Sequence, residues 1–205
     1  SGITLTNEYM ILIEKFNFTI PELLRVIDFG FKSAFVTQNM RNRLRIEAFI
    51  KAFNILEKNG FDLTEVSKMQ RYYYKIGVAV PPKFVPPQKH PELTLSFIES
   101  LPKCDLDCRL LGSVPLELLY KFYQETPEKD KKGILPEFSS FEDLKKYIIE
   151  ETPSNFNANA KVLSRALLQT ESHIREAVKA ILAEAYSDNV TYMELTVCPH
   201  LHARK

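Results

Sequence analysis

Asp107 and Arg109, in the middle of the chain, carry charged side chains that could bind an ion or pair with each other. They stand two positions apart in Leu101–Ser113, which reads LPKCDLDCRLLGS and predicts a short strand over residues 104–110. Because alternate residues of a strand face the same side, the two side chains should point the same way, and Arg109 can pair there with Asp107 or with other carboxylates on that side. Asp107 could bind a metal ion, but Arg109 carries a permanent charge and has no lone pair to offer.

His200 and His202 form a His-x-His pattern directly after a second predicted strand that begins at Val190. Neutral imidazoles are common zinc ligands, so both histidines are candidates for a metal site. A structural role at the exit of the strand is the alternative that we favour. Glu194, on the strand itself, is also predicted to be structural rather than catalytic.

Helices dominate the rest of the chain and must hold these strands in place. Thr19, Pro21 and Glu22 give the Thr-x-x-Glu signature of a capped helix start. Gly60 predicts the end of another helix, because glycine adopts the left-handed conformation without strain. Ser113 is the predicted cap of the helix after the first strand. The expected helices cover residues 5–16, 20–35, 38–59, 60–76, 91–99, 115–124, 140–150, 155–170 and 171–186, with residues 126–137 as a loop.

A proline-rich segment separates the first helices from the first strand. Five prolines fall within residues 78–91, which excludes a helix and favours an extended, stiff linker. The alternative is a ligand for a proline-recognition domain. His90 lies in this segment, where we expect it to be exposed to solvent.

The composition of the chain limits which partners it can bind and predicts the cell compartment. The 205 residues carry a net charge of +1, which argues against broad electrostatic binding to nucleic acid or to a membrane surface. Neither a long apolar run nor a leader is evident, so we expect no membrane insertion. The three cysteines favour reduced thiols over a disulfide framework. These features predict an intracellular, reducing compartment, the cytoplasm by default, with an organelle as the alternative.

The stretch Leu101–Ser113 resembles the first strand of the adenosine deaminase family of metal-dependent hydrolases. Family members typically read LPKx(D/E)LHxHLDGS at this strand, and its two histidines bind the catalytic metal. Asp107 and Arg109 occupy those two positions here, and Leu111, followed by Gly112, replaces the substrate-binding aspartate. The resemblance implies that the metal site is lost. The simplest physical account is that Arg109 lies in or near the vacated position, in a buried pair with Asp107 or with other inward carboxylates.

Two further segments carry the same resemblance. Val190–Lys205 resembles the second strand of the family and its exit, where bacterial members read close to VxYxExRxxPxLH. The segments Ser1–Tyr9, Phe18–Thr19 and Lys32–Phe35 resemble the closing helices of bacterial-type members, which follow the eighth strand there but precede the first strand here. The order is therefore that of a permuted chain or of a junction between tandem domains. Three parts are expected: closing helices over 1–60, a helix with a proline-rich linker over 61–91, and the start of a barrel over 92–205.

The expected fold class is α/β, predominantly helical, with a partial (β/α)₈ barrel of the metal-dependent hydrolase type that is incomplete in this chain. Two strands cannot close a barrel, so another protein chain or domain must supply the remaining strands. The leading interpretation is an adenosine-deaminase-like pseudoenzyme segment with a structural or assembly role. The alternative is a part of a functioning adenosine or purine deaminase whose active site lies in another domain or subunit. A proline-linked interaction module is a third, less favoured interpretation.

Catalytic residues and a cofactor are not assigned to this chain. Active family members use zinc, and the resemblance assigns their remaining catalytic groups to strands that have no counterpart here. We therefore expect the chain alone to be inactive and to hold no zinc, and the sequence leaves the retention of purine binding open.

Overall fold

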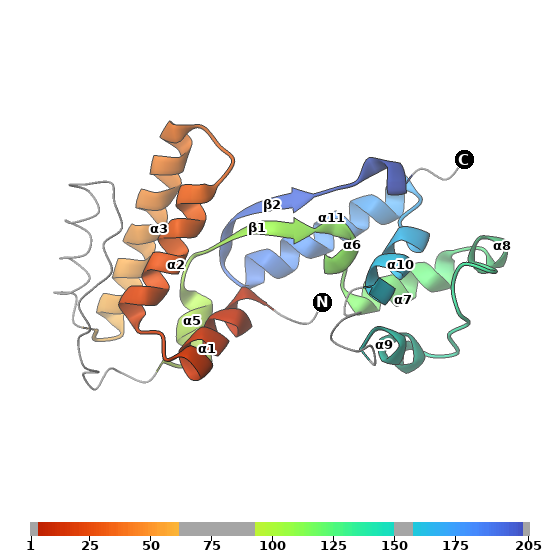
Figure 1. The fold of residues 1–205 in the computed structure, drawn as a ribbon, viewed down its shortest axis with the longest axis horizontal. Helices are drawn as coiled ribbons and strands as arrows, with labels where there is room; N and C mark the ends of the chain where they lie inside the picture. The colour runs from red at the N-terminus through yellow and green to blue at the C-terminus, as the bar shows by residue number, and fades with distance from the viewer. Residues whose placement is uncertain (1–3, 62–92, 150–157, 203–205) are drawn as a thin grey trace. The chain divides into compact units, whose positions relative to one another are not determined.

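The computed structural model describes residues 4–61, 93–149 and 158–202. These residues form helices and one two-stranded parallel sheet, made of β1 (Lys103–Arg109) and β2 (Val190–Thr196) (Figure 1). The chain divides into two compact units. Of the described residues, the amino-terminal unit contains 4–61, 93–106 and 188–192, and the carboxyl-terminal unit contains 107–149, 158–187 and 193–202. Each strand therefore contributes residues to both units.

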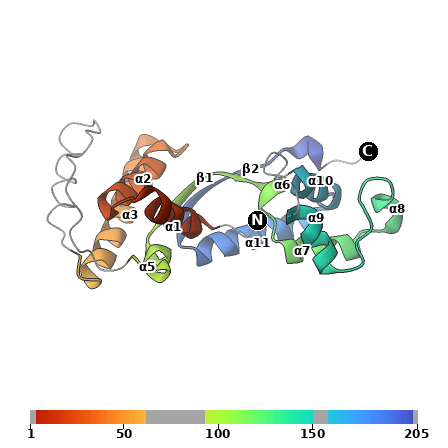
Figure 2. The same cartoon turned by 60° about the horizontal axis from the view of Figure 1, so that its bottom comes forward.

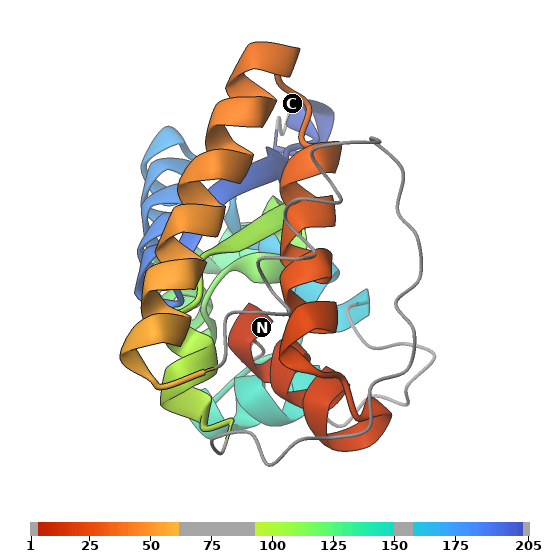
Figure 3. The same cartoon turned by 90° about the vertical axis from the view of Figure 1, so that its left-hand side faces the viewer.

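Four helices build the amino-terminal unit: α1 (Leu5–Phe16), α2 (Ile20–Ser33), α3 (Gln38–Lys58) and α5 (Leu95–Ser100). α2 packs along α3, as Figure 3 shows, and α1 packs against α5. Their apolar faces meet in one core that also receives the first half of β1. Its fully buried members include Leu23, Phe31, Leu56, Ile98 and Leu101.

Local sequence explains where these helices begin and end. Thr4 caps α1 by accepting a hydrogen bond from the Asn7 amide at 3.2 Å, and α1 ends at Asn17 in the left-handed conformation. The predicted capping box of α2 is confirmed, because Glu22 accepts from the Thr19 amide at 2.8 Å. Gly60 follows α3 with a φ of +73°, as its glycine predicted.

The carboxyl-terminal unit contains α6 (Leu110–Ser113), α7 (Leu116–Glu125), α8 (Glu128–Lys131), α9 (Phe141–Ile149), α10 (Ala158–Leu167) and α11 (Glu171–Ser187), and the 3₁₀ turn Pro199–Leu201. α7, α9 and α10 pack on one another, as Figure 2 shows, and α10 also packs on α6. The apolar core between these helices receives the second half of both strands. Its fully buried members include Leu110, Phe122, Leu144, Leu163 and Leu167.

Three details differ from the sequence prediction, two at the exit of the first strand and one in the loop over residues 126–137. β1 ends at Arg109, one residue early, because Leu110 turns into α6 and is fully buried in the core. Ser113 lies inside α6 and does not cap α7, whose N-cap position is taken by Pro115. Residues 126–137 also contain the short helix α8, which begins directly after Pro127.

The other predicted helices with described counterparts are confirmed, with differences of up to four residues at their ends. The predicted helix over 60–76 and the proline-rich linker with His90 lie outside the described residues, and the division into three parts stays a prediction. The fold class is confirmed as α/β and mostly helical, but the described residues contain two strands and do not close a barrel. In the described parts of the chain, helices are too short or too polar to cross a membrane.

Candidate functional site

Asp107 and Arg109 lie together on one face of β1, as the alternation of the strand predicted. Arg109 donates from Nε to Asp107 Oδ1 at 3.0 Å and from Nη2 to Asp107 Oδ2 at 2.9 Å. This two-point contact, together with the charge of the carboxylate, raises the pKa of the Arg109 guanidinium. Between them in the sequence, Cys108 points the other way and is buried in the core.

The expectation that this ion pair is buried is wrong for this structure. The Arg109 side chain is 60% exposed and the Asp107 side chain is 68% exposed. The sheet has two strands among the described residues, and its face at Asp107 and Arg109 leaves both side chains in contact with solvent. In this setting the pair is an exposed salt bridge, whose attraction is weakened by water.

The residues at this position do not fit a zinc ion. Zinc requires neutral imidazole, thiolate or carboxylate ligands that converge from several directions. Arg109 has no lone pair, and both Asp107 oxygens accept hydrogen bonds from Arg109. Over residues 4–61, 93–149 and 158–202, histidine, cysteine and acidic side chains do not gather in any group of three that could hold a metal.

Leu111 and Gly112, at the substrate-binding position of the resemblance, lie in α6. Leu111 is partly buried and packs against the core of the carboxyl-terminal unit. A Cβ atom at Gly112 would meet open space, so neither close packing nor a positive φ requires glycine there. This turn therefore presents no polar side chain at the position where the family pattern has an aspartate.

His200 and His202 follow β2 at the Pro199–Leu201 turn and are placed differently. His200 is exposed. His202 places Nδ1 2.9 Å from the Leu168 carbonyl oxygen, and because a carbonyl can only accept, Nδ1 carries the proton. His202 Nε2 is buried without a hydrogen-bond partner in the described structure. His202 thus ties the exit of β2 to the residue after α10, and the metal role of the two histidines stays a prediction.

The other residues of the strands have simple surroundings. Glu194 is half-buried on β2, and its structural role stays a prediction. Cys104 and Cys108 are buried, Cys198 is half-buried, and all three are free of disulfides, as the cysteine count predicted.

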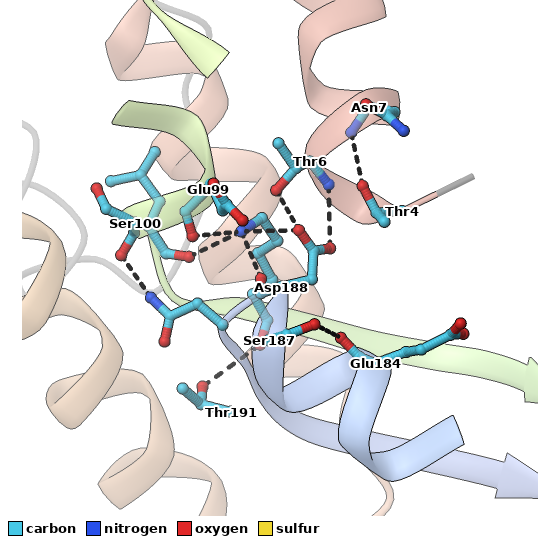
Figure 4. Close-up of polar contacts among 12 residues, drawn as sticks. Thr4, Thr6, Asn7, Glu99, Ser100, Glu184, Ser187, Asp188 and Thr191 are labelled. Atoms are coloured by element: carbon cyan, nitrogen blue, oxygen red, sulfur yellow. Dashed lines mark hydrogen bonds and ion pairs between the residues drawn. The ribbon is translucent and has the colours of Figure 1, made fainter. Parts of the chain in front are cut away.

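Sequence reasoning missed a buried polar cluster in the amino-terminal unit, at the start of both strands (Figure 4). Lys103 is fully buried, and its ammonium group donates to three carbonyl oxygens: those of Glu99 at 3.0 Å, Leu101 at 3.2 Å and Asp188 at 2.6 Å. Its nitrogen also lies 3.7 Å from Asp188 Oδ1. Burial lowers the pKa of Lys103, and the Asp188 carboxylate partly opposes that effect.

Asp188 joins this ammonium group to the amino-terminal end of α1. Its Oδ2 accepts from the Thr6 amide at 3.2 Å, and its Oδ1 accepts from the Thr6 hydroxyl. Asn189 donates to the Ser100 carbonyl and lies in the left-handed conformation of the predicted turn. The signals in the sequence were the lysine after Pro102 and the Asp-Asn pair before β2, but neither indicates a partner as distant as Thr6.

Comparison with known proteins relates this chain to a curated protein. The parallel strands and their helices define an α/β chain whose polar residues gather at the start and at the end of β1. The chain is similar to a protein named probable adenosine deaminase from Dictyostelium discoideum, with 32% identity over 234 aligned residues. The alignment covers 100% of this chain and 30% of that protein, so the chain spans under a third of the length of this curated relative.

This similarity supports a relationship to the adenosine deaminase family and extends over both units. Protein-family profiles were searched, and none matches the chain. Solved structures likewise give no match.

Proposed function

We propose that this chain is part of an adenosine-deaminase-like pseudoenzyme, in which a salt bridge has replaced the metal ligands of the first strand. The observation that carries the proposal is the two-point contact between Arg109 and Asp107, at the positions where the family pattern has two histidines. An arginine there places a permanent positive charge where an active enzyme would place a cation. The role that remains is structural, in the assembly of a larger protein or complex.

The proposed partner is a chain or domain that supplies further strands. Among the described residues the sheet contains β1 and β2, and a strand with an open edge offers unpaired backbone groups to another strand. Apolar side chains also face outward in the carboxyl-terminal unit. Leu182 and Tyr186, one turn apart on α11, are 50% and 85% exposed, and Val197 after β2 is 42% exposed.

The alternative function is a part of a working adenosine or purine deaminase whose active site is supplied by another domain or subunit. One observation favours it: the curated relative bears the name of an enzyme, and 70% of its length lies outside the aligned part. That alignment also runs through both the first helices and the two strands, so the relative has counterparts of these segments in the same chain order. A shared order is compatible with both functions.

Zinc content and adenosine turnover of the full-length protein separate the two functions. The pseudoenzyme proposal predicts neither stoichiometric zinc by elemental analysis nor deamination of adenosine, even after incubation with zinc. The alternative predicts both, and it predicts that the double variant Asp107→Ala/Arg109→Ala keeps them, because these residues lie outside the working site.

A third result would contradict both functions. If the full-length protein is active and Asp107→Ala/Arg109→Ala abolishes activity, the pair belongs to a working active site. The matched control is Arg43→Ala/Glu47→Ala, which removes an exposed salt bridge of α3 with side chains 71% and 52% exposed. This control should leave zinc content and turnover unchanged in every case.

A further inference from the structure

In the buried cluster at the start of the strands, each charged group lies beside groups of the opposite charge. The Lys103 ammonium lies among three backbone carbonyls, which carry partial negative charge, and beside the Asp188 carboxylate. The carboxylate in turn faces the amino-terminal end of α1, where the first amides of a helix point outward with partial positive charge. Each charged group is therefore balanced on both sides, which is what makes its burial tolerable.

Asp188 acts as an external cap for α1. Thr6 is the second residue of that helix, so its amide has no partner within the helix and is satisfied by the Asp188 carboxylate. The neighbouring cap is local, because Thr4 accepts from the Asn7 amide on the exposed side. One helix end is thus held by two different devices, one within the helix and one across 182 positions of sequence.

α1 buries fewer apolar side chains than α2 does. Its buried residues are Thr6 and Tyr9; Met10, Leu12 and Ile13 are partly buried against the core, and Ile11 and Phe16 are 47% and 65% exposed. Tyr9 follows Thr6 by three positions and so lies on the same face of the helix. Burial raises the pKa of its hydroxyl, and the charge of Asp188 adds to that effect. Thr6 and Tyr9 therefore place a polar contact and a buried apolar contact on one patch of α1.

We propose that α1 is a strap, latched by Asp188 and Lys103 to the start of the two strands, which opens as one piece when the latch is broken. The proposal goes beyond the function proposed above and does not depend on it. Elements that open locally are those with few buried apolar contacts. α1 buries one apolar side chain, that of Tyr9, whereas α2 buries those of Ile20, Leu23, Leu24, Ile27 and Phe31. α2 and α3 pack along each other and bury more apolar side chains in the shared core, so they stay folded when the strap opens.

Hydrogen exchange of the full-length protein, followed by mass spectrometry, tests the latch in four variants. Asp188→Asn removes the charge but keeps the shape, and Thr6→Val removes the hydroxyl alone. We expect amide exchange in Leu5–Phe16 to rise roughly tenfold or more in Asp188→Asn and by a smaller factor in Thr6→Val. Exchange in α2 and α3 should stay within error of the parent protein. Thr6→Ser keeps the hydroxyl and should restore the slow exchange of α1.

Thr4→Ala is the matched control, because it removes the local cap of the same helix and leaves Asp188 untouched. A rise in Thr4→Ala as large as that in Thr6→Val would overturn the latch, since capping alone would then explain the effect. Unchanged exchange in α1 for both Thr6→Val and Asp188→Asn would also overturn it. So would an equal rise in α1, α2 and α3, which would mean that the whole unit loosens. If Asp188→Asn does not fold, the comparison of Thr6→Val, Thr6→Ser and Thr4→Ala decides the question.

Discussion

Lys103 and Arg109 are the two cations of β1, and their surroundings are opposite. Lys103 is fully buried and surrounded by carbonyl oxygens, whereas Arg109 is 60% exposed and contacts a neighbour on its own strand. Removing a buried cation leaves partners that water cannot reach, so Lys103 should matter to folding. Removing an exposed cation leaves a carboxylate that water solvates, so Arg109 should matter little to the stability of the chain as described.

Gly30 gives a prediction at the scale of single residues. A Cβ atom there would lie 3.1 Å from the Cβ of Cys104 on β1, closer than most Cβ contacts in proteins, so Cys104 would have to shift by a few tenths of an ångström. Gly30→Ala should therefore be less stable than Gly112→Ala by about 1–2 kcal/mol, because overpacking outweighs the usual helical gain of alanine. Urea denaturation measures both variants. Gly112→Ala is the control, since its Cβ meets open space, and an equal gain for both variants would show that Cys104 yields.

The helices of the amino-terminal unit are the elements that the sequence predicts best. α1, α2 and α3 have apolar residues at helical spacing together with cap residues, and their limits agree with prediction within two positions. Such signals are local, so the sequence contains them directly. α6 and α8 were missed because short helical turns depend on tertiary contacts, such as the burial of Leu110.

The site was predictable only where the partners are close in sequence. The contact between Asp107 and Arg109 follows from strand alternation. Its exposure was not predictable, because exposure depends on which elements cover the sheet. The contact of Thr6 with Asp188 joins residues 182 positions apart, and a sequence pattern gives no direct measure of such a pairing.

The capping box of α2 gives a prediction at the scale of the element. Hydrogen bonding to the Thr19 amide lowers the pKa of Glu22 below its usual value of about 4.3. The charge of Glu22 therefore stabilises the fold above that pH, and the contribution is lost as the pH falls through the lower pKa of the folded state. Glu22→Gln keeps an acceptor but no charge, so it should cost about 0.5 kcal/mol at neutral pH.

Thermal or urea unfolding from pH 7 down to about pH 3 checks this prediction, because the range crosses the pKa of free glutamate at about 4.3. The difference between the parent protein and Glu22→Gln should be constant near neutrality and should shrink in acid. Thr19→Ala, which removes the other side chain of the box, should cost about 1 kcal/mol. A difference that grows in acid would show that the sign of the pKa shift is wrong.

For the whole molecule, the central question is what covers the sheet. The curated relative is more than three times as long as the part that aligns with this chain, since that part is 30% of its length. The described residues place a charged pair on a sheet of two strands, which is a surface that a barrel would enclose. Whether this surface is covered in the full-length protein can be measured directly.

Chemical modification of arginine by phenylglyoxal, read by mass spectrometry, gives that measurement. In the full-length protein Arg109 should react several-fold more slowly than Arg43, because further strands would exclude the reagent from the sheet. Arg43 is a matched control, since it too is in an exposed salt bridge, with its side chain 71% exposed against 60% for Arg109. Equal reactivity in the full-length protein would count against a completed barrel and against the proposed partner.

Charged side chains at alternate positions of β1 would face any strand or domain that covers the sheet. Lys103, Asp105, Asp107 and Arg109 occupy every second position, so one face of the strand carries two positive and two negative side chains and no net charge. In the family pattern, two metal-binding histidines stand at the positions of Asp107 and Arg109. Here Asp107 and Arg109 neutralise each other, and Lys103 is already balanced by Asp188, so a surface that covered the pair would enclose no net charge.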